Sequence, residues 1–378
     1  MSRPAEGPAR HEWLRQISLT GQGPQEEQWT FRRPGAQDVL AVRVSSGKSV
    51  DIKALKRQSS FLAEARRGEE LRHAFPDKSR FLAIQSCPVC RAPVSDAVKD
   101  ARIWDTDYFR CLGCGHAYAD RCPPDEDLER FYAQHGADGN YYIRDEEIEL
   151  RLKEIYLPKL EWAVAAYKAN FGREPRSLLE MGSGAGHFLH CASRKCHAVA
   201  GVECDTVTST WCRERFGIEV AASADELPET TFDMVCSFNV IEHTTDPAHF
   251  ARLQRRYMGP ESLLVLETPK YNSLTTAVQK VFSTVVRTHI APFKHNHLFS
   301  DASLATLLFN NGLRVTDVWY FGQDMTEVLF QAFHAQGLEV DMDTVNAFMG
   351  APQAALDAAG ACDLILMAAK NAPPTPGA

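Results

Sequence analysis

The stretch Ser177-Leu-Leu-Glu-Met-Gly-Ser-Gly-Ala-Gly-His-Phe188 decides the fold, because it joins a predicted strand to a predicted helix through three glycines. Glycine lets the backbone take positive φ and approach a ligand closely, and the first turn of the following helix offers unpaired N–H groups. A dinucleotide-binding loop of the form G-x-G-x-x-G that starts at Gly182 needs a glycine at position 187, where this chain has His187. The spacing therefore argues against a loop that holds a pyrophosphate.

Strands and helices are predicted to alternate from Ser177 onward, after two helices that precede the loop. The strand-like runs are residues 177–181, 198–203, 232–238, 262–267, 313–321 and 362–370. The segments with the helical spacing of apolar residues are 125–135, 146–171, 187–195, 247–257, 302–309 and 343–359. From Ser177 onward this alternation indicates a parallel, doubly wound α/β sheet that is covered by helices on both faces.

The glycine loop, read as E-x-G-x-G-x-G from Glu180, resembles the first motif of class I S-adenosylmethionine-dependent methyltransferases. Residues 201–203, 232–243 and 267–269 resemble later motifs of the same family, so the resemblance runs continuously from about Ser177 to Thr268. It implies an enzyme with a Rossmann-like doubly wound sheet of seven strands, the last of them antiparallel.

The resemblance also implies which residues bind S-adenosylmethionine. In the family the loop wraps a nucleoside whose methionine portion reaches over the glycines, and an acid at the end of the next strand binds both ribose hydroxyls. Glu203 supplies that acid. Ser223 departs from the family, which often has an Asp there, so the adenine contact is assigned to the backbone N–H of Ala224. The implied cofactor-binding residues are Glu180, Gly182, Ser183, Gly184, Gly186, Glu203, Ala224 and Asn239.

Four of the 11 cysteines form two C-x2-C pairs, Cys87 with Cys90 and Cys111 with Cys114, in surroundings rich in turn-forming residues. Two such pairs can provide four thiolates to one tetrahedral Zn²⁺ at about 2.3 Å, and four thiolates leave no open coordination position. We therefore predict a structural zinc ion. The other seven cysteines are predicted to pack as small apolar side chains.

The segment from Tyr108 to Tyr132 is similar to the zinc-ribbon leader of bacterial methyltransferases associated with deoxysugar, polysaccharide and secondary-metabolite biosynthesis. Before it, residues 1–38 are predicted to be loosely ordered, 39–52 to form a small hairpin and 54–73 a helix. The predicted organisation is a leader (1–86), a zinc ribbon (87–122), a helical connector (123–172), a methyltransferase domain (173–370) and a disordered tail (371–378).

Candidate catalytic residues follow the strand at 232–238, where the acceptor meets the methyl group in class I enzymes. His243 is the candidate base that takes the acceptor's proton, and Glu242 its orienting partner or a second base. A histidine there can equally cap the following turn. Substrate contacts are assigned to Tyr141 and Tyr142, and to the histidines of the H-x-H segment, His295 and His297. Packing between segments is the alternative for the tyrosines, and a local hydrogen bond is the alternative for the histidines.

The composition limits the remaining classes. The 378 residues are 44% hydrophobic and 24% charged, as in an ordinary globular protein. No apolar run approaches the roughly 20 residues of a membrane-spanning helix, and residues 1–22 lack the apolar region of a secretory signal, so we expect a cytoplasmic protein without a membrane span. The net charge of −8 divides into about +5 up to Ser86 and −13 beyond it, which makes a nucleic-acid partner an unfavourable prediction.

The leading hypothesis is therefore a methyltransferase that acts on a small-molecule or glycan-like acceptor, with O-methylation favoured over C- or N-methylation. Two alternatives stay open. One is an RNA methyltransferase that uses the ribbon to recognise its substrate, and the other is a non-catalytic module that binds the cofactor and works as an interaction surface. The sequence predicts neither the identity of the acceptor nor the oligomeric state.

Overall fold

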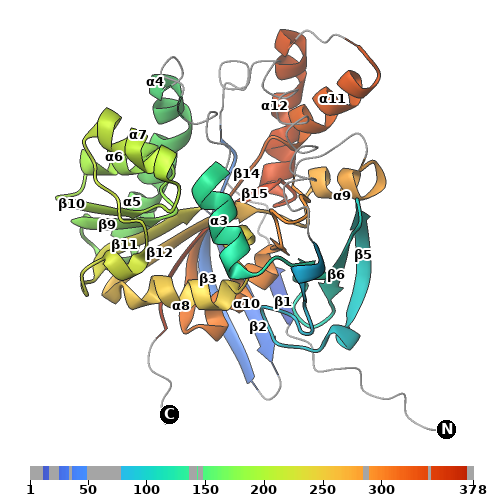
Figure 1. Ribbon diagram of the computed structural model, residues 1–378, viewed down its shortest axis with the longest axis horizontal. Helices are drawn as coiled ribbons and strands as arrows, with labels where there is room; N and C mark the ends of the chain where they lie inside the picture. Colours follow the sequence, from blue (N-terminus) through green and yellow to red (C-terminus); the bar gives the residue numbers. More distant parts are fainter. Residues whose placement is uncertain are drawn as a thin grey trace.

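The computed structural model describes residues 12–16, 25–33, 36–48, 78–135, 143, 148–283, 289–338 and 342–372. The predicted helix at 54–73, the aromatic pair Tyr141 and Tyr142, and most of the predicted tail lie outside these residues. Two sheets dominate the part that is described. In Figure 1 the larger one runs from the left of the view to below its centre, and the smaller one stands at the right.

The larger sheet has nine strands in the order β1-β2-β3-β14-β15-β12-β11-β9-β10. Their bounds are β1 Glu12–Gln16, β2 Gln25–Arg33, β3 Ala36–Ser46, β9 Ser177–Met181, β10 Ala198–Val202, β11 Phe232–Phe238, β12 Met258–Pro269, β14 Leu313–Phe321 and β15 Leu364–Asn371. Strands β10, β9, β11 and β12 pair in parallel, whereas β15 runs antiparallel between β12 and β14. The predicted Rossmann-like class and the antiparallel last strand are confirmed.

The number of strands differs from the predicted seven for two reasons. Beyond β10 the described chain adds only a single parallel bridge, between Val202 and Ala221. At the other edge, β3 pairs in parallel with β14 and carries β2 and β1 with it. The N-terminal segment thus extends the main sheet.

The prediction that residues 1–38 are loosely ordered is wrong for residues 12–16, 25–33 and 36–38. Side chains alternate across a strand, and Trp29 and Phe31 on one face of β2 are buried together with Val42 of β3. The predicted hairpin is also corrected, because the partner of β3 is β2, which precedes it, rather than residues that follow Gly47. Arg43 of β3 donates two hydrogen bonds, of 2.6 and 2.8 Å, to the carboxylate of Asp317 in β14.

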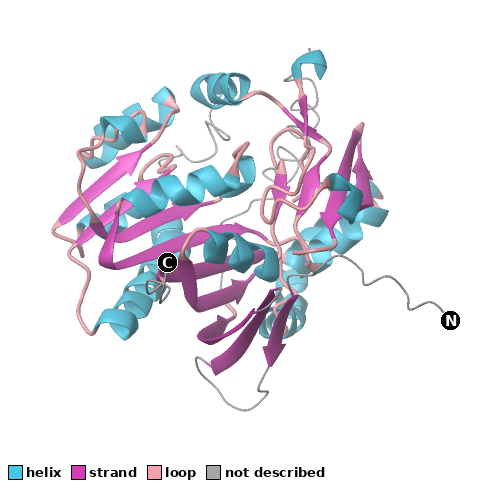
Figure 2. Ribbon diagram, turned by 90° about the horizontal axis from the view of Figure 1, so that it is seen from below, coloured by secondary structure: helices cyan, strands magenta, loops and turns pink. Residues whose placement is uncertain are grey.

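Helices cover both faces of the main sheet, as Figure 2 shows. Their bounds are α3 Asp125–His135, α4 Ile148–Arg151, α5 Leu157–Phe171, α6 His187–Ser193, α7 Thr206–Phe216, α8 Pro247–Arg256, α9 Leu274–Val281, α10 Asp301–Asn310, α11 Asp324–Ala335 and α12 Met342–Ala358. Residues Leu152–Tyr156 form a π-helical turn that joins α4 to α5. The predicted long helix is therefore present from Ile148 onward. Gly172 ends it as the C-cap, with φ 72°.

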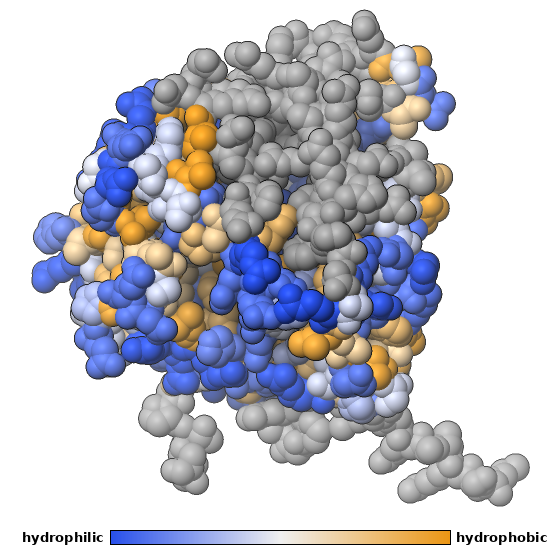
Figure 3. Space-filling view, in the orientation of Figure 1, coloured by the Kyte–Doolittle hydropathy of each residue, from blue (hydrophilic) through white to orange (hydrophobic). Residues whose placement is uncertain are grey.

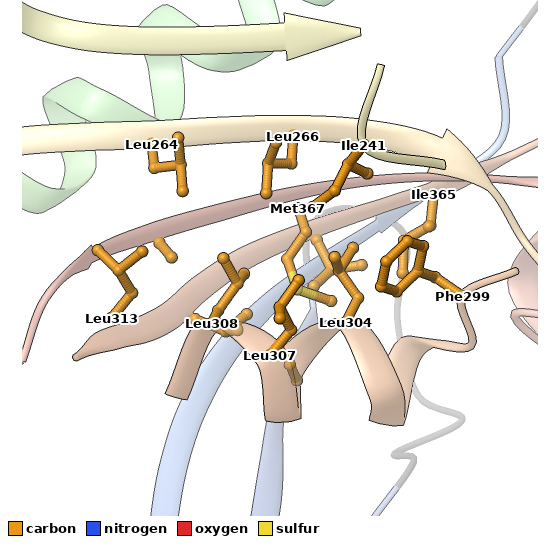
Figure 4. Close-up of a cluster of buried hydrophobic side chains, with 14 of the residues drawn as sticks. Ile241, Leu264, Leu266, Phe299, Leu304, Leu307, Leu308, Leu313, Ile365 and Met367 are labelled. Atoms are coloured by element: carbon orange, nitrogen blue, oxygen red, sulfur yellow. The ribbon is translucent and has the colours of Figure 1, made fainter. Parts of the chain in front are cut away.

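Each face of the sheet has its own apolar core. On one face, Leu304, Leu307 and Leu308 of α10 pack beneath Leu266 and Met367 of the sheet (Figure 4). On the other face, α5 and α6 bury leucines and aromatic rings against the same strands. The carboxyl ends of β9, β10, β11 and β12 are thereby held at one edge, where ligands bind in open α/β sheets.

The smaller sheet has the order β13-β7-β6-β5, formed by β5 Ala97–Ile103, β6 Thr106–Cys111, β7 Ala117–Ala119 and β13 His297–Leu298. A further pair, β4 Leu82–Ala83 with β8 Arg121–Cys122, lies beside it. Strand β13 comes from the segment between β12 and α10, so the sheet of the predicted ribbon is completed by residues of the large α/β domain.

On the face seen in Figure 3, hydrophilic residues predominate among those coloured, and hydrophobic ones occur in small separate groups. Among the described residues no helix has both the length and the apolar character needed to cross a membrane.

Candidate functional site

The glycine loop turns sharply between β9 and α6. Gly182, Gly184 and Gly186 all have positive φ, at 75°, 51° and 74°. A side chain at Gly182 would collide with Val240, and one at Gly186 would collide with Cys212. At Gly184, by contrast, a Cβ would meet no described atom within 4 Å. Two of the glycines are therefore required for packing, and the middle one borders open space.

Glu203 follows β10 and is tied to the glycine loop. Its Oε2 accepts a hydrogen bond from the N–H of Gly184 at 2.7 Å, and its Oε1 accepts one from the N–H of Asp205 at 2.8 Å. Burial raises the pKa of this carboxyl, while the two backbone hydrogen bonds oppose that shift. A carboxylate oxygen has more than one lone pair, so each oxygen can accept a further donor.

Glu180 of β9 is almost fully buried, with 3% of its surface exposed. Its Oε2 has no hydrogen-bond partner among the described residues, and burial together with the charge of Glu203 raises its pKa well above the usual value. The hydroxyl of Ser183 is likewise buried and without a described partner. Buried polar atoms without partners are rare, and here they belong to two residues at the turn between β9 and α6.

Asn239 directly follows β11 and has a positive φ of 54°. Its backbone N–H donates to the carbonyl of Glu267 at 2.9 Å, and its Nδ2 donates to Glu267 Oε1 at 3.0 Å. At Ala224, the carbonyl oxygen accepts from the hydroxyl of Tyr257 at 2.6 Å. This bond fixes the short turn whose N–H is assigned to the adenine.

A buried ion pair lies next to Asn239 and was not predicted from the sequence. Lys159 of α5 donates to Glu267 Oε1 at 2.7 Å, and their side chains are 8% and 1% exposed. Lys48, at the end of β3, lies near both, and burial followed by the charge of Lys159 lowers its pKa to about 7. In the sequence, this ion pair is indicated only by a lysine among the apolar residues of α5, and nothing near that lysine identifies Glu267 as its partner.

Glu242 and His243 lie in a 3-10 turn, Ile241–His243, after β11. His243 Nδ1 lies 2.7 Å from the carbonyl oxygen of Lys294 and 2.9 Å from the hydroxyl of Tyr132 in α3. Glu242 is 1% exposed, and burial raises its pKa to about 8. The hydroxyl of Thr268 donates to Glu242 Oε2 at 3.1 Å. Tyr132 is a contact of this pair that sequence reasoning did not assign.

The two histidines of the H-x-H segment face different surroundings. The ring of His295 lies beside that of His243, with centroids 4.8 Å apart. His297 instead contacts His116 of the ribbon at 3.3 Å, and burial lowers its pKa to about 4. Residues two apart normally share a face of a strand, but β13 begins at His297, so His295 is not bound by that rule. The structure thus brings only His295 to the Glu242–His243 pair.

The four cysteines of the two C-x2-C pairs lie with their sulfur atoms within 4.8 Å of one another. Cys87 Sγ is 3.5 Å from Cys114 Sγ, and Cys90 Sγ is 3.5 Å from Cys111 Sγ. Thiolates that share a zinc ion at about 2.3 Å lie about 3.8 Å apart. The residue after each pair, Arg91 or Gly115, has positive φ, so both turns fold in the same way around the sulfurs. The cluster fits a zinc ribbon.

The remaining cysteines are mostly buried, as predicted. The exception is Cys204, which is exposed beside Glu203, so the prediction that it packs in the core is wrong. It stands in the loop that follows β10, where the chain leaves the sheet.

The part of the chain that contains the glycine loop is similar to known proteins. Residues 157–318 match a family described as "Methyltransferase domain". A "probable S-adenosylmethionine-dependent methyltransferase" of Mycobacterium tuberculosis is 32% identical over 188 residues, which cover 47% of this chain and 62% of that protein. A similarly described protein of Mycolicibacterium smegmatis is 31% identical over 146 residues, which cover 38% of this chain and 53% of that protein.

A solved structure of a SAM-dependent methyltransferase from Archaeoglobus fulgidus superposes with a TM-score of 0.39 and 18% identity, over 60% of this chain and 100% of that chain. The match to the mycobacterial proteins spans less than two thirds of their length.

Proposed function

Because residues 157–318 match a methyltransferase-domain family, we propose that the whole protein is a class I S-adenosylmethionine-dependent enzyme that transfers a methyl group to a small-molecule or sugar-containing acceptor. The observation that carries the proposal is the bond between Glu203 and Gly184, which sets a carboxylate against an open glycine loop. A nucleoside with two vicinal hydroxyls fits that carboxylate, because each oxygen keeps a lone pair for one of them.

In this proposal, different residues around the loop bind different parts of the cofactor. Glu203 binds the ribose, and the backbone of Ala224 reads the edge of the adenine. Gly182, Gly184 and Gly186 let the methionine portion pass close to the backbone, and Ser183 provides a hydroxyl there. Glu180 and Asn239 then lie on the side of the loop toward β11, where the amino group of the methionine needs acceptors.

The cofactor supplies an activated methyl group, and the chain's own part is to align the acceptor and manage its proton. We propose that the acceptor binds above the Glu242–His243 pair, with His295 at its side. His243 is held through its Nδ1 by the carbonyl of Lys294, so its ring has a fixed direction from which to take a proton. An acceptor with a hydroxyl group suits this arrangement, which favours O-methylation.

The zinc and the location of the protein are part of the same proposal. Cys87, Cys90, Cys111 and Cys114 would hold one structural Zn²⁺, since all four donors are thiols and no position is left for a reactant. Thiolate ligands and free cysteines suit the reducing cytoplasm.

The proposal is tested by calorimetry with S-adenosylhomocysteine and by transfer of radiolabelled methyl groups to a panel of sugars, sugar nucleotides and small phenols. Binding of the nucleoside together with labelling of at least one hydroxyl-bearing acceptor is the expected result. Absence of nucleoside binding by the folded, zinc-loaded protein would contradict it.

A further inference from the structure

Three ligand-type side chains converge at the carboxyl end of β11. Glu242, His243 and His295 each offer one oxygen or ring nitrogen, and these atoms all lie within 4.8 Å of one another. Glu242 Oε1 and His243 Nε2 are 3.8 Å apart. The first two residues come from one short turn, whereas His295 comes from the segment that leads into β13, so only the tertiary fold assembles the group.

Backbone carbonyls set the protonation of both imidazoles. His243 Nδ1 lies 2.7 Å from the carbonyl oxygen of Lys294, and His295 Nδ1 lies 2.6 Å from that of His289. A carbonyl oxygen can only accept, so Nδ1 of each ring carries the proton and Nε2 of the neutral ring carries the lone pair. An Nδ1–H bonded to a backbone carbonyl is the usual second contact of a metal-ligating histidine.

Glu242 supplies the third donor. Its Oε2 accepts from the hydroxyl of Thr268, which fixes the carboxyl group, while its Oε1 has no hydrogen-bond partner among the described residues. The side chain is 1% exposed, and a buried carboxyl oxygen without a partner is costly. A cation at this point would remove that cost.

We propose that Glu242, His243 and His295 bind a divalent transition-metal ion such as Zn²⁺ or Fe²⁺ through one oxygen and two Nε2 atoms. Two imidazoles with one carboxylate are a preferred donor set for these ions. Ligands about 2.0–2.2 Å from such an ion lie about 3.0–3.5 Å from one another. The three ligand atoms, now at most 4.8 Å apart, therefore have to come closer by no more than about 1.8 Å to hold such an ion.

Three protein ligands leave coordination positions open, in contrast to the four cysteines of the ribbon. Resting on the proposed function, the inference names the acceptor class more closely: an open position would take a hydroxyl oxygen of the acceptor. The ion would lower the pKa of that hydroxyl, and its proton would then pass to solvent water. In this metal-bound form His243 would serve as a ligand rather than as the base.

The test titrates Co²⁺ into the full chain with its ribbon zinc in place and follows the visible spectrum. Co²⁺ held by nitrogen and oxygen gives weak visible bands, whereas Co²⁺ held by thiolates adds intense charge-transfer bands, so the two sites are distinguishable. We expect a single class of site with weak bands only. Absence of these bands at saturating Co²⁺ would overturn the inference.

Variants locate the ion. Glu242→Gln keeps the shape of the side chain and a contact for Thr268, and His295→Ala removes one nitrogen. Each is expected to weaken Co²⁺ binding by at least about 100-fold, since loss of a residue that only hydrogen-bonds to a ligand already weakens metal binding by up to about 100-fold. His249→Ala, on the exposed side of α8, is the matched control and should bind Co²⁺ as the wild type does. Equal Co²⁺ affinity in both site variants would place the ion elsewhere and refute the assignment.

Calorimetry with S-adenosylhomocysteine on the same samples separates the two proposals. Nucleoside binding without Co²⁺ binding overturns the metal site alone, and Co²⁺ binding without nucleoside binding overturns the proposed function alone. Should His295→Ala not fold, Glu242→Gln carries the test.

Discussion

The carboxylate of Glu203 and the backbone N–H of Gly184 are joined by a 2.7 Å hydrogen bond that ties the end of β10 to the loop after β9. The second oxygen of Glu203 is held by the N–H of Asp205, so the carboxyl group has a fixed plane before any ligand arrives. A side chain that is ordered in advance loses little entropy when it binds, and the affinity for the nucleoside should depend on it.

Replacing Glu203 by Ala is therefore expected to weaken S-adenosylmethionine binding by about 10- to 100-fold, since a hydrogen bond to a charged group contributes about 1.5–3 kcal/mol. Calorimetry measures the change. Glu214→Ala, an exposed acid on α7, should leave the affinity as it is. An unchanged affinity in Glu203→Ala would show that the ribose is bound elsewhere.

The glycines of the loop should respond differently to alanine. Gly182→Ala brings a methyl group against Val240, so we expect a large loss of thermal stability. Gly184→Ala meets open space and suffers only the strain of positive φ, about 1 kcal/mol, but its methyl group occupies the proposed cofactor path. Thermal unfolding and nucleoside calorimetry together test this contrast, which fails if Gly184→Ala binds the nucleoside normally.

Removal of the ribbon metal should destabilise more than the ribbon. Cys111→Ser is expected to remove most of the bound zinc. It should also reduce the melting temperature of the whole chain, because the cysteines pack in the same apolar core as the main sheet. Elemental analysis and calorimetric scans measure both effects. Cys204→Ser, at the exposed cysteine, is the control. A zinc-free variant with unchanged melting would disprove a structural role.

The lysine at the end of β3 should give the stability a pH dependence. Burial and Lys159 lower the pKa of Lys48 from 10.5 to about 7 in the folded chain. Between pH 7 and 10.5 the unfolded chain binds the extra proton, so the destabilising effect of this residue is complete below about pH 7 and fades as the pH rises. Lys48→Met should thus stabilise the protein more at pH 6 than at pH 9.5 in denaturant titrations. An equal gain at both values would contradict the lowered pKa.

His243→Ala is expected to lower the turnover by about 10²- to 10⁴-fold, the range found for loss of a proton-transfer group. Loss of an ion that lowers the pKa of the acceptor hydroxyl would change the turnover in the same direction. The affinity for S-adenosylhomocysteine should stay near that of the wild type, because the glycine loop and Glu203 do not contact this ring in the described hydrogen bonds. Single-turnover kinetics with His249→Ala as control check the expectation. Undiminished turnover would remove His243 from the chemistry.

The elements that sequence reasoning placed best are those whose signal is local. The strands at 177–181, 232–238 and 313–321 have the predicted bounds, because each is a short apolar run with a turn on either side. Strand β2 was missed, although its buried Trp29 and Phe31 alternate with polar residues. It joins the main sheet only through β3, whose other partner, β14, is far away in the sequence.

The site shows the same limit. The glycine loop and the acid after β10 are linked by a motif and could be predicted with their spacing. Lys159 and Glu267 are 108 residues apart, and only the packing of α5 on β12 brings them together. The separation of His295 from His297 depends in turn on where β13 begins to pair with β7, which no local pattern reveals.

Strand β13 has a consequence for how this chain can be re-engineered. Its two residues, His297 and Leu298, complete the ribbon sheet, and His295 stands just before them. The ribbon is thus paired with the segment that precedes α10, beside which we propose that the acceptor binds, so these two parts of the chain should be exchanged together. A chimera that receives the ribbon of another chain must also receive that chain's counterpart of residues 289–298. Otherwise β7 of the new ribbon will lack the strand with which it pairs.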